Sequence, residues 1–122
     1  MTAEEKLWLL IQTLVMKTAQ GAVVWEATAA KNAYQASFPE YGVRIVESQR
    51  PDYSDPTYLL EVLDGNGKVI ERADNTDVLE AVPQAGIQAR RTMRDLYNTA
   101  RRHALSVDTA LDSLLSELEK AS

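Results

Sequence analysis

The apolar residues of this chain recur with a helical period near both ends and alternate with polar residues through the middle, and this change of period most constrains the fold. Between positions 22 and 74, short alternating runs are separated by glycine, proline, asparagine and aspartate, a pattern typical of half-buried strands joined by turns. Residues 3–19, 87–104 and 107–119 instead carry apolar residues at spacings of three and four, as amphipathic helices do. The sequence therefore predicts an α+β domain with an N-terminal helix, a five-stranded antiparallel meander and two C-terminal helices.

The first predicted helix begins with a capping-box pattern. Thr2 precedes Glu5 by three residues, so each side chain can accept a hydrogen bond from the other's backbone N–H, and Gly21 suits the left-handed residue that ends many helices. Trp8 and Met16 lie outside the main apolar stripe of this helix, so apolar side chains occur on more than one of its sides. We therefore expect the helix either to be deeply buried or to contact a second chain.

Turn residues divide the middle of the chain into five strands. The faces predicted for the first three strands are Val23, Trp25 and Ala27; Tyr34, Ala36 and Phe38; and Val43 with Ile45. The fourth and fifth strands, 57–63 and 68–73, flank a tight hairpin predicted at 64–67. We interpret aromatic residues at alternating positions as part of the core.

Two helices are predicted near the C-terminus. Pro83 and Gly86 argue against a helix through 80–86, although 77–81 can form a short turn. The apolar stripe of the second predicted helix is Met93, Leu96, Tyr97, Ala100 and Ala104. Ser106 is the predicted N-cap of the third helix, whose stripe is Leu111, Leu114, Leu115 and Leu118.

Composition bounds the chemistry of the chain. Its 122 residues suit one domain, 1–122, and the absence of cysteine excludes disulfides and thiolate metal sites. The longest apolar run has five residues against the ~20 of a membrane-spanning helix, and the N-terminus is acidic rather than basic. We therefore expect a cytoplasmic protein with no membrane contact, no metal and no cofactor.

Charge is unevenly distributed along the chain. The net charge is −5, which argues against general nucleic-acid binding because that binding depends on lysine and arginine neutralising phosphates. Residues 84–105 nevertheless carry five basic and one acidic side chain, whereas 106–122 carry one basic and four acidic side chains. The positive charge is concentrated on the second predicted helix.

The arginines of that helix are the main candidate site. At about 100° per residue, Arg90, Arg94 and Arg101 fall within about 40° of one another, with Asn98 about 40° further round. Such an arginine ridge can bind a phosphate or carboxylate group, as in a nucleotide. The alternative interpretation is a solvated helix face that balances an acidic protein.

Two further sets of residues are candidate sites. Trp8, Met16 and Tyr53 are candidates for an interface, Tyr53 because it lies in a polar loop where no core position explains it. His103 is the only histidine and no nucleophile motif accompanies it, so the sequence contains no catalytic constellation that we can identify.

Three classes of function remain, in this order. The first is a small non-enzymatic interaction protein that self-associates, most simply as a homodimer, and could serve as an inhibitor or immunity-type protein. The second is a binder of a small anionic ligand such as a nucleotide, through the arginine ridge. The third is an enzyme of unknown class.

Overall fold

The computed structural model describes residues 1–49 and 55–121 and confirms the predicted α+β fold. The elements are α1 (Ala3–Ala19), β1 (Glu26–Ala27), β2 (Ala33–Ser37), β3 (Gly42–Ser48), β4 (Thr57–Leu63), β5 (Val69–Asp74), α2 (Asn75–Ala81), the 3₁₀ turn η1 (Pro83–Ala85), α3 (Gln88–Ala104) and α4 (Val107–Lys120). Among the described helices, none is long and apolar enough to cross a membrane.

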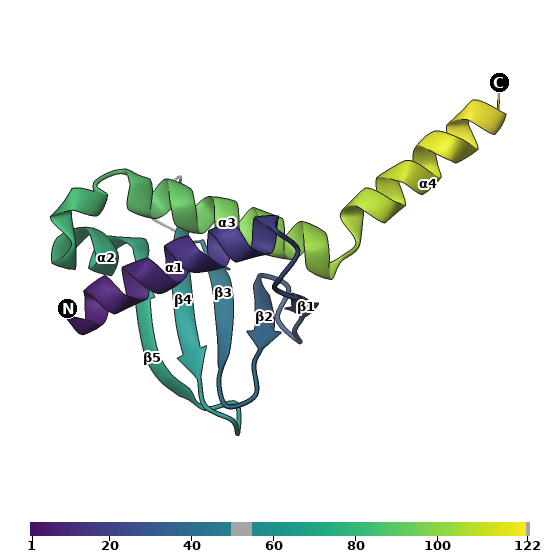
Figure 1. The fold of residues 1–122 in the computed structure, drawn as a ribbon. Coiled ribbons are helices and arrows are strands. Elements are labelled where there is room, and N and C mark those ends of the chain that lie inside the picture. Colours follow the sequence, from purple (N-terminus) through teal and green to yellow (C-terminus); the bar gives the residue numbers. More distant parts are fainter. Residues whose placement is uncertain (50–54, 122) are drawn as a thin grey trace.

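The strands form one antiparallel sheet in the order of the chain, from β1 to β5. Helices α1 and α3 pack against each other and lie across one face of this sheet, as Figure 1 shows. Helix α4 continues beyond the end of α3 and points away from the sheet (Figure 1). The molecule therefore has one layer of helices on one layer of sheet, with α4 outside both.

The core fills the space between the helices and the sheet. Alternation along β3 and β4 directs Ile45 and Leu60 toward the helices, where both are fully buried and lie opposite each other in register. The helices contribute the stripes that their spacing predicts, including Leu7, Ile11 and Leu14 from α1 and Met93, Leu96, Tyr97 and Ala100 from α3. Burial of these apolar side chains is the main stabilising contribution to the fold.

The structure contains the predicted capping box at the start of α1 and the predicted tight turn between β4 and β5. Glu5 donates its backbone N–H to Thr2 Oγ1 at 3.1 Å, and Thr2 donates its backbone N–H to Glu5 Oε1 at 3.0 Å, which lowers the pKa of the Glu5 carboxyl. In the hairpin after β4, the Asp64 carboxylate accepts the backbone N–H of Lys68 at 2.9 Å, and Gly67 has a φ of +82°. Glycine adopts a positive φ readily because it has no Cβ, whereas other residues are strained at such a φ.

The first strand is shorter than predicted. Val23 and Trp25 are buried but precede β1, because the Trp25 indole Nε1 donates to Thr18 Oγ1 at 3.0 Å and holds this segment against the end of α1. Ala27 is exposed at the edge of the sheet. Phe38 is also exposed and lies outside β2, because its backbone N–H already bonds Tyr41 O in the turn toward β3.

Two helix starts also differ from the sequence expectation. Ser106 holds the predicted N-cap position of α4, but its backbone lies in the left-handed region, with a φ of 53°, and its side chain makes no cap hydrogen bond. The short turn expected at 77–81 is helix α2, which begins at Asn75 with a second capping box between Asp74 and Asp77. Two aspartates three residues apart form this box, instead of the serine or threonine and glutamate of the usual pattern.

Candidate functional site

The arginine ridge lies along α3, and its first member links that helix to the sheet. The guanidinium of Arg90 donates from Nε and Nη2 to the carbonyl oxygen of Pro56, both at 3.4 Å. Nη2 of Arg90 is also 3.9 Å from Asp55 Oδ1, and the guanidinium carbon lies 6.0 Å from the ring centroid of Tyr58. Arg90 therefore holds the start of β4 against α3 as well as contributing charge.

The other ridge residues have different surroundings. Arg94 Nε lies 3.7 Å from the carboxylate of its neighbour Asp95, a partly exposed pair of the kind that contributes little to stability. Arg101 makes no ion pair with another described residue, and Asn98 is exposed. An anion bound along the ridge would have to compete with Asp55 and Asp95.

A cluster of three tyrosines lies beneath the ridge. The ring of Tyr97 is 5.5 Å from that of Tyr34 and 5.8 Å from that of Tyr58, centroid to centroid. The Tyr58 hydroxyl donates to Glu47 Oε2 at 3.0 Å, so β3 brings a carboxylate to the same region. All three tyrosines are buried, which agrees with their interpretation as core residues.

Burial and charge together change the acidity of this cluster. Burial raises the pKa of Tyr58 to about 12, and the hydrogen bond to the Glu47 carboxylate adds to the increase. Burial also raises the pKa of Tyr97 to about 12, again with a contribution from Glu47. The charges of Arg90 and Arg94 oppose the increase at Tyr58.

We expect these two tyrosines to ionise late and to destabilise the fold when they do. A tyrosine with an ordinary pKa of 10.0 when unfolded and about 12 when folded stabilises the fold fully below pH 10, and this contribution is lost as the pH rises toward 12. An ultraviolet titration should show two tyrosines ionising with the alkaline unfolding transition, and Tyr58→Phe should remove one of them. Ionisation of every tyrosine near pH 10 in a protein that stays folded would contradict this expectation.

A groove lies between α2 and the start of α3. It has a volume of about 380 Å³ and is lined by Asn75, Leu79, Gly86, Ile87, Ala89, Arg90, Arg91 and Arg94. Ile87 is 80% exposed and Leu79 is 43% exposed, so the groove combines apolar side chains open to solvent with three guanidinium groups. Two of the four predicted ridge residues, Arg90 and Arg94, line this groove, whereas Asn98 and Arg101 do not. We call it the arginine groove.

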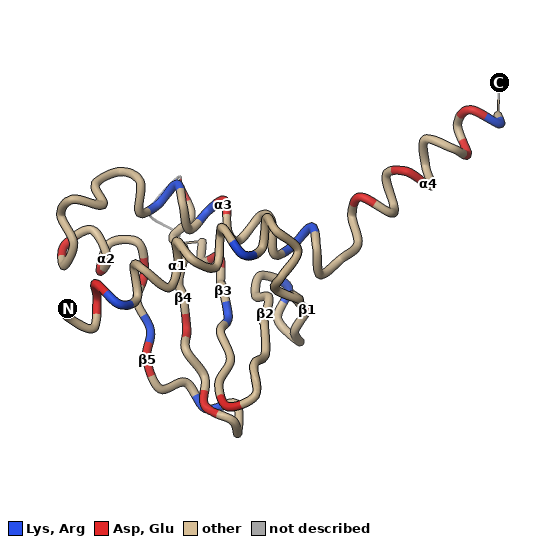
Figure 2. The backbone as a smooth tube through the Cα atoms, in the orientation of Figure 1, with Lys and Arg blue, Asp and Glu red and all other residues tan. Residues whose placement is uncertain are grey.

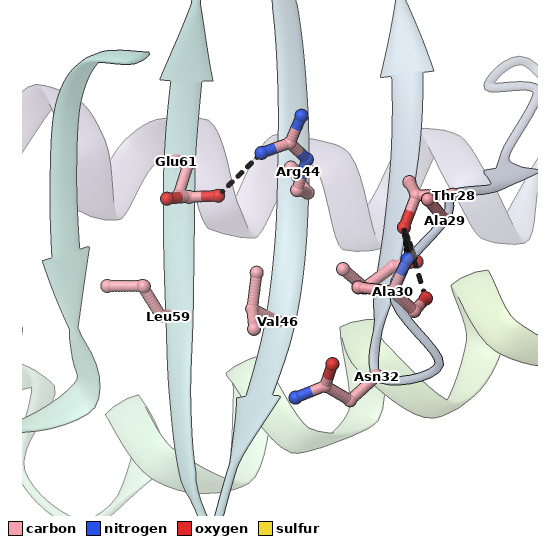
Figure 3. A pocket seen from close by; sticks show the side chains of 9 residues that line it. Thr28, Ala29, Ala30, Asn32, Arg44, Val46, Leu59 and Glu61 are labelled. Carbon is pink, nitrogen blue, oxygen red and sulfur yellow. Dashed lines mark hydrogen bonds and ion pairs between the residues drawn. The ribbon is translucent and has the colours of Figure 1, made fainter.

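A second cavity lies on the sheet face opposite α1 and α3 (Figure 3). It measures about 370 Å³ and is lined by Thr28, Ala29, Ala30, Asn32, Ala33, Arg44, Val46, Leu59 and Glu61. Arg44 and Glu61 face each other in register, with Nη1 of Arg44 3.1 Å from Glu61 Oε1, and Arg44 Nη2 donates to Gln35 Oε1 at 3.2 Å. Arg44 Nε is buried and has no hydrogen-bond partner within the described residues.

Sequence reasoning missed this sheet cavity. Arg44 and Glu61 each occupy a polar position in an alternating strand, so the pattern alone indicates a solvent-facing side chain. Their ion pair depends on the register between β3 and β4, which no local signal specifies. Most of the sheet cavity's polar groups are already paired with one another.

The predicted interface residues are in different surroundings. Trp8 is half-buried and packs against the core, whereas Met16 is exposed on α1. Tyr53 lies outside the described residues.

Helix α4 exposes an apolar stripe that no other described element covers. None of its residues is buried, and its four leucines are 45% to 67% exposed: Leu111, Leu114, Leu115 and Leu118. An ion pair of 2.6 Å between Arg102 Nη2 and Asp108 Oδ1 joins α3 to α4 near their junction. Figure 2 shows the contrast in charge between these helices, with basic residues on α3 and acidic residues predominating on α4.

Neither a metal centre nor a known relative points to a further site in the described part of the chain. Among residues 1–49 and 55–121, no group of three histidine, cysteine, aspartate or glutamate side chains is placed to hold a metal ion. Models of known families, curated proteins and solved structures give no match to this chain.

Proposed function

We propose that this protein is a non-enzymatic interaction protein that associates with a second copy of itself through α4. The observation that carries the proposal is the leucine stripe of α4. Its four large apolar side chains lie on one face of a helix that, among the described elements, contacts α3 at their junction and otherwise projects away from the domain. A helix of 14 residues is marginal by itself in water, because most helix stability in proteins comes from packing of an apolar face. A partner surface supplies that packing.

The free energy of association favours a two-fold symmetric dimer over a complex in which only one α4 is buried. Full burial of a leucine stabilises a complex by about 1.5–3 kcal/mol, and side chains that are already partly covered gain less. The four leucines of one α4 would therefore contribute an amount similar to the ~4–15 kcal/mol that association costs in lost translational and rotational freedom. A two-fold dimer doubles the contribution, since each copy presents the same surface to the other.

The mass of the full-length protein in solution tests the proposal. Sedimentation equilibrium at micromolar concentrations should give about twice the chain mass of 13.6 kDa, with dissociation on dilution. A mass of 13.6 kDa at every concentration would exclude self-association. The acidic surplus of the chain would then favour a basic heterologous partner, as an inhibitor or immunity-type protein would have.

Binding of a small anion is the second candidate function, because Arg90, Arg91 and Arg94 line one groove. A ligand at about one hundred times its dissociation constant would stabilise the protein by about 2.7 kcal/mol and raise Tm by several degrees. We expect Arg94→Ala to lose most of that increase, whereas Arg102→Ala, at the other end of α3, should keep it. A thermal-shift series with mononucleotides, cyclic nucleotides and sugar phosphates measures the effect, and no shift in the wild type would remove this candidate.

A further inference from the structure

The arginine groove and α4 have matching chemistry. The groove offers Leu79 and Ile87 beside Arg90, Arg91 and Arg94, whereas α4 offers a leucine stripe flanked by carboxylates. At about 100° per residue, Asp112 and Glu119 lie roughly 40–60° from Leu115, on the same side of the stripe. A helix seated in the groove would place leucines on Leu79 and Ile87 and carboxylates near the guanidinium groups.

We propose that the arginine groove of one copy binds α4 of a second copy, and that the groove of the second copy binds α4 of the first. This inference rests on the proposed function and specifies the surface on which α4 docks. It also accounts for the apolar residues of the groove, which a small phosphate ligand would leave exposed.

The chain's own α4 does not reach this groove. Helix α3 has 17 residues and is ~25 Å long, with the groove at its N-terminal end and α4 attached at its C-terminal end. Helix α4 then continues away from the groove (Figure 1). The occupant must therefore come from another molecule.

The charges favour docking of α4 on the arginine groove over pairing of two α4 helices. Residues 106–122 carry a net charge of −3, so α4 against α4 would bring like charges together, whereas residues 84–105 carry +4. Figure 2 shows these opposite charges on adjoining parts of the chain. Docking of the acidic helix on the basic groove gives complementary charges, which favour one partner surface over others.

A single substitution in the groove tests the docking surface. Ile87→Asp should weaken dimerisation about tenfold or more, because it places a carboxylate among the docked leucines, and its 80% exposure allows the monomer to fold. Ile70→Asp is the matched control, since Ile70 is an exposed isoleucine on β5 away from the groove. If Leu114→Asp dissociates the dimer and Ile87→Asp does not, α4 docks elsewhere and this inference fails while the proposed function stands. If the wild type is a monomer, both fail.

A pair of charge-reversed variants tests the exchange itself. The first variant carries Arg91→Glu and Arg94→Glu and therefore has an acidic groove; the second carries Asp112→Lys and Glu119→Lys and has a basic α4. Each variant alone would face like charges and should dimerise about tenfold or more weakly, whereas an equimolar mixture pairs opposite charges at both contacts and should recover the dimer mass. Circular dichroism checks that each variant folds. A mixture of folded variants that stays monomeric, or variants that dimerise normally alone, would overturn the inference.

Discussion

Ile45→Ala should lower the free energy of unfolding by about 2–5 kcal/mol, which is a large part of the stability of a small domain. Ile45 is 0% exposed and lies at the centre of β3, the middle strand of the sheet. Its neighbours in register are Tyr34 on β2 and Leu60 on β4, all of them in the core under the helices. Truncation removes buried methyl and methylene groups and leaves a cavity that a well-packed sheet fills only in part.

Ile70→Ala provides the matched control on the same sheet. Ile70 lies on β5, is 51% exposed and loses the same atoms, so its replacement should cost less than about 1 kcal/mol. Urea denaturation followed by circular dichroism measures both values. Equal costs at the two positions would show that β3 does not lie at the centre of the core.

Leu114→Asp combined with Leu118→Asp should raise the dimer dissociation constant by about a hundredfold or more, because two apolar contacts become carboxylates in an apolar interface. Both leucines are at least 60% exposed in the single chain, so the monomer fold loses little packing. Sedimentation equilibrium should therefore give the 13.6 kDa chain mass while circular dichroism stays native.

Ser113→Asp separates the loss of the leucine stripe from the effect of added charge. Ser113 lies about 150° from the middle of the stripe, on the opposite side of α4. The Ser113→Asp substitution adds a negative charge to the same helix and should leave the dimer mass unchanged. Dissociation by Ser113→Asp to the same extent would mean that charge, rather than the leucine face, governs association.

The sequence predicted those parts of the fold whose signals are local. The period of the apolar residues correctly located three of the helices and the five-stranded meander, and the Thr2–Glu5 box identified the start of α1. The hairpin at Asp64–Gly67 followed from the residues that tight turns require. Each of these features depends on residues within a few positions of one another.

Features that depend on distant segments were not predictable in this way. The segment before β1 is held by a bond between Trp25 and Thr18, and the sheet cavity depends on the register that pairs Arg44 with Glu61. Arg90 and Arg94 were identified from their spacing. The two exposed apolar residues of the groove, Leu79 and Ile87, come from α2 and from the residue just before α3, and they belong to no predicted apolar stripe. The period of α4 predicted an amphipathic helix without indicating that its leucines stay exposed among residues 1–49 and 55–121.

Hydrogen exchange of the α4 amides as a function of protein concentration tests most directly whether a second copy covers this helix. A short helix exposed on all sides opens readily, so its amides should exchange rapidly in dilute protein and become protected over the concentration range in which the mass doubles. The amides of β3 should be protected at every concentration and serve as the internal reference. Rapid exchange throughout α4 in a protein that has already dimerised would contradict the proposal, because it would place the interface elsewhere.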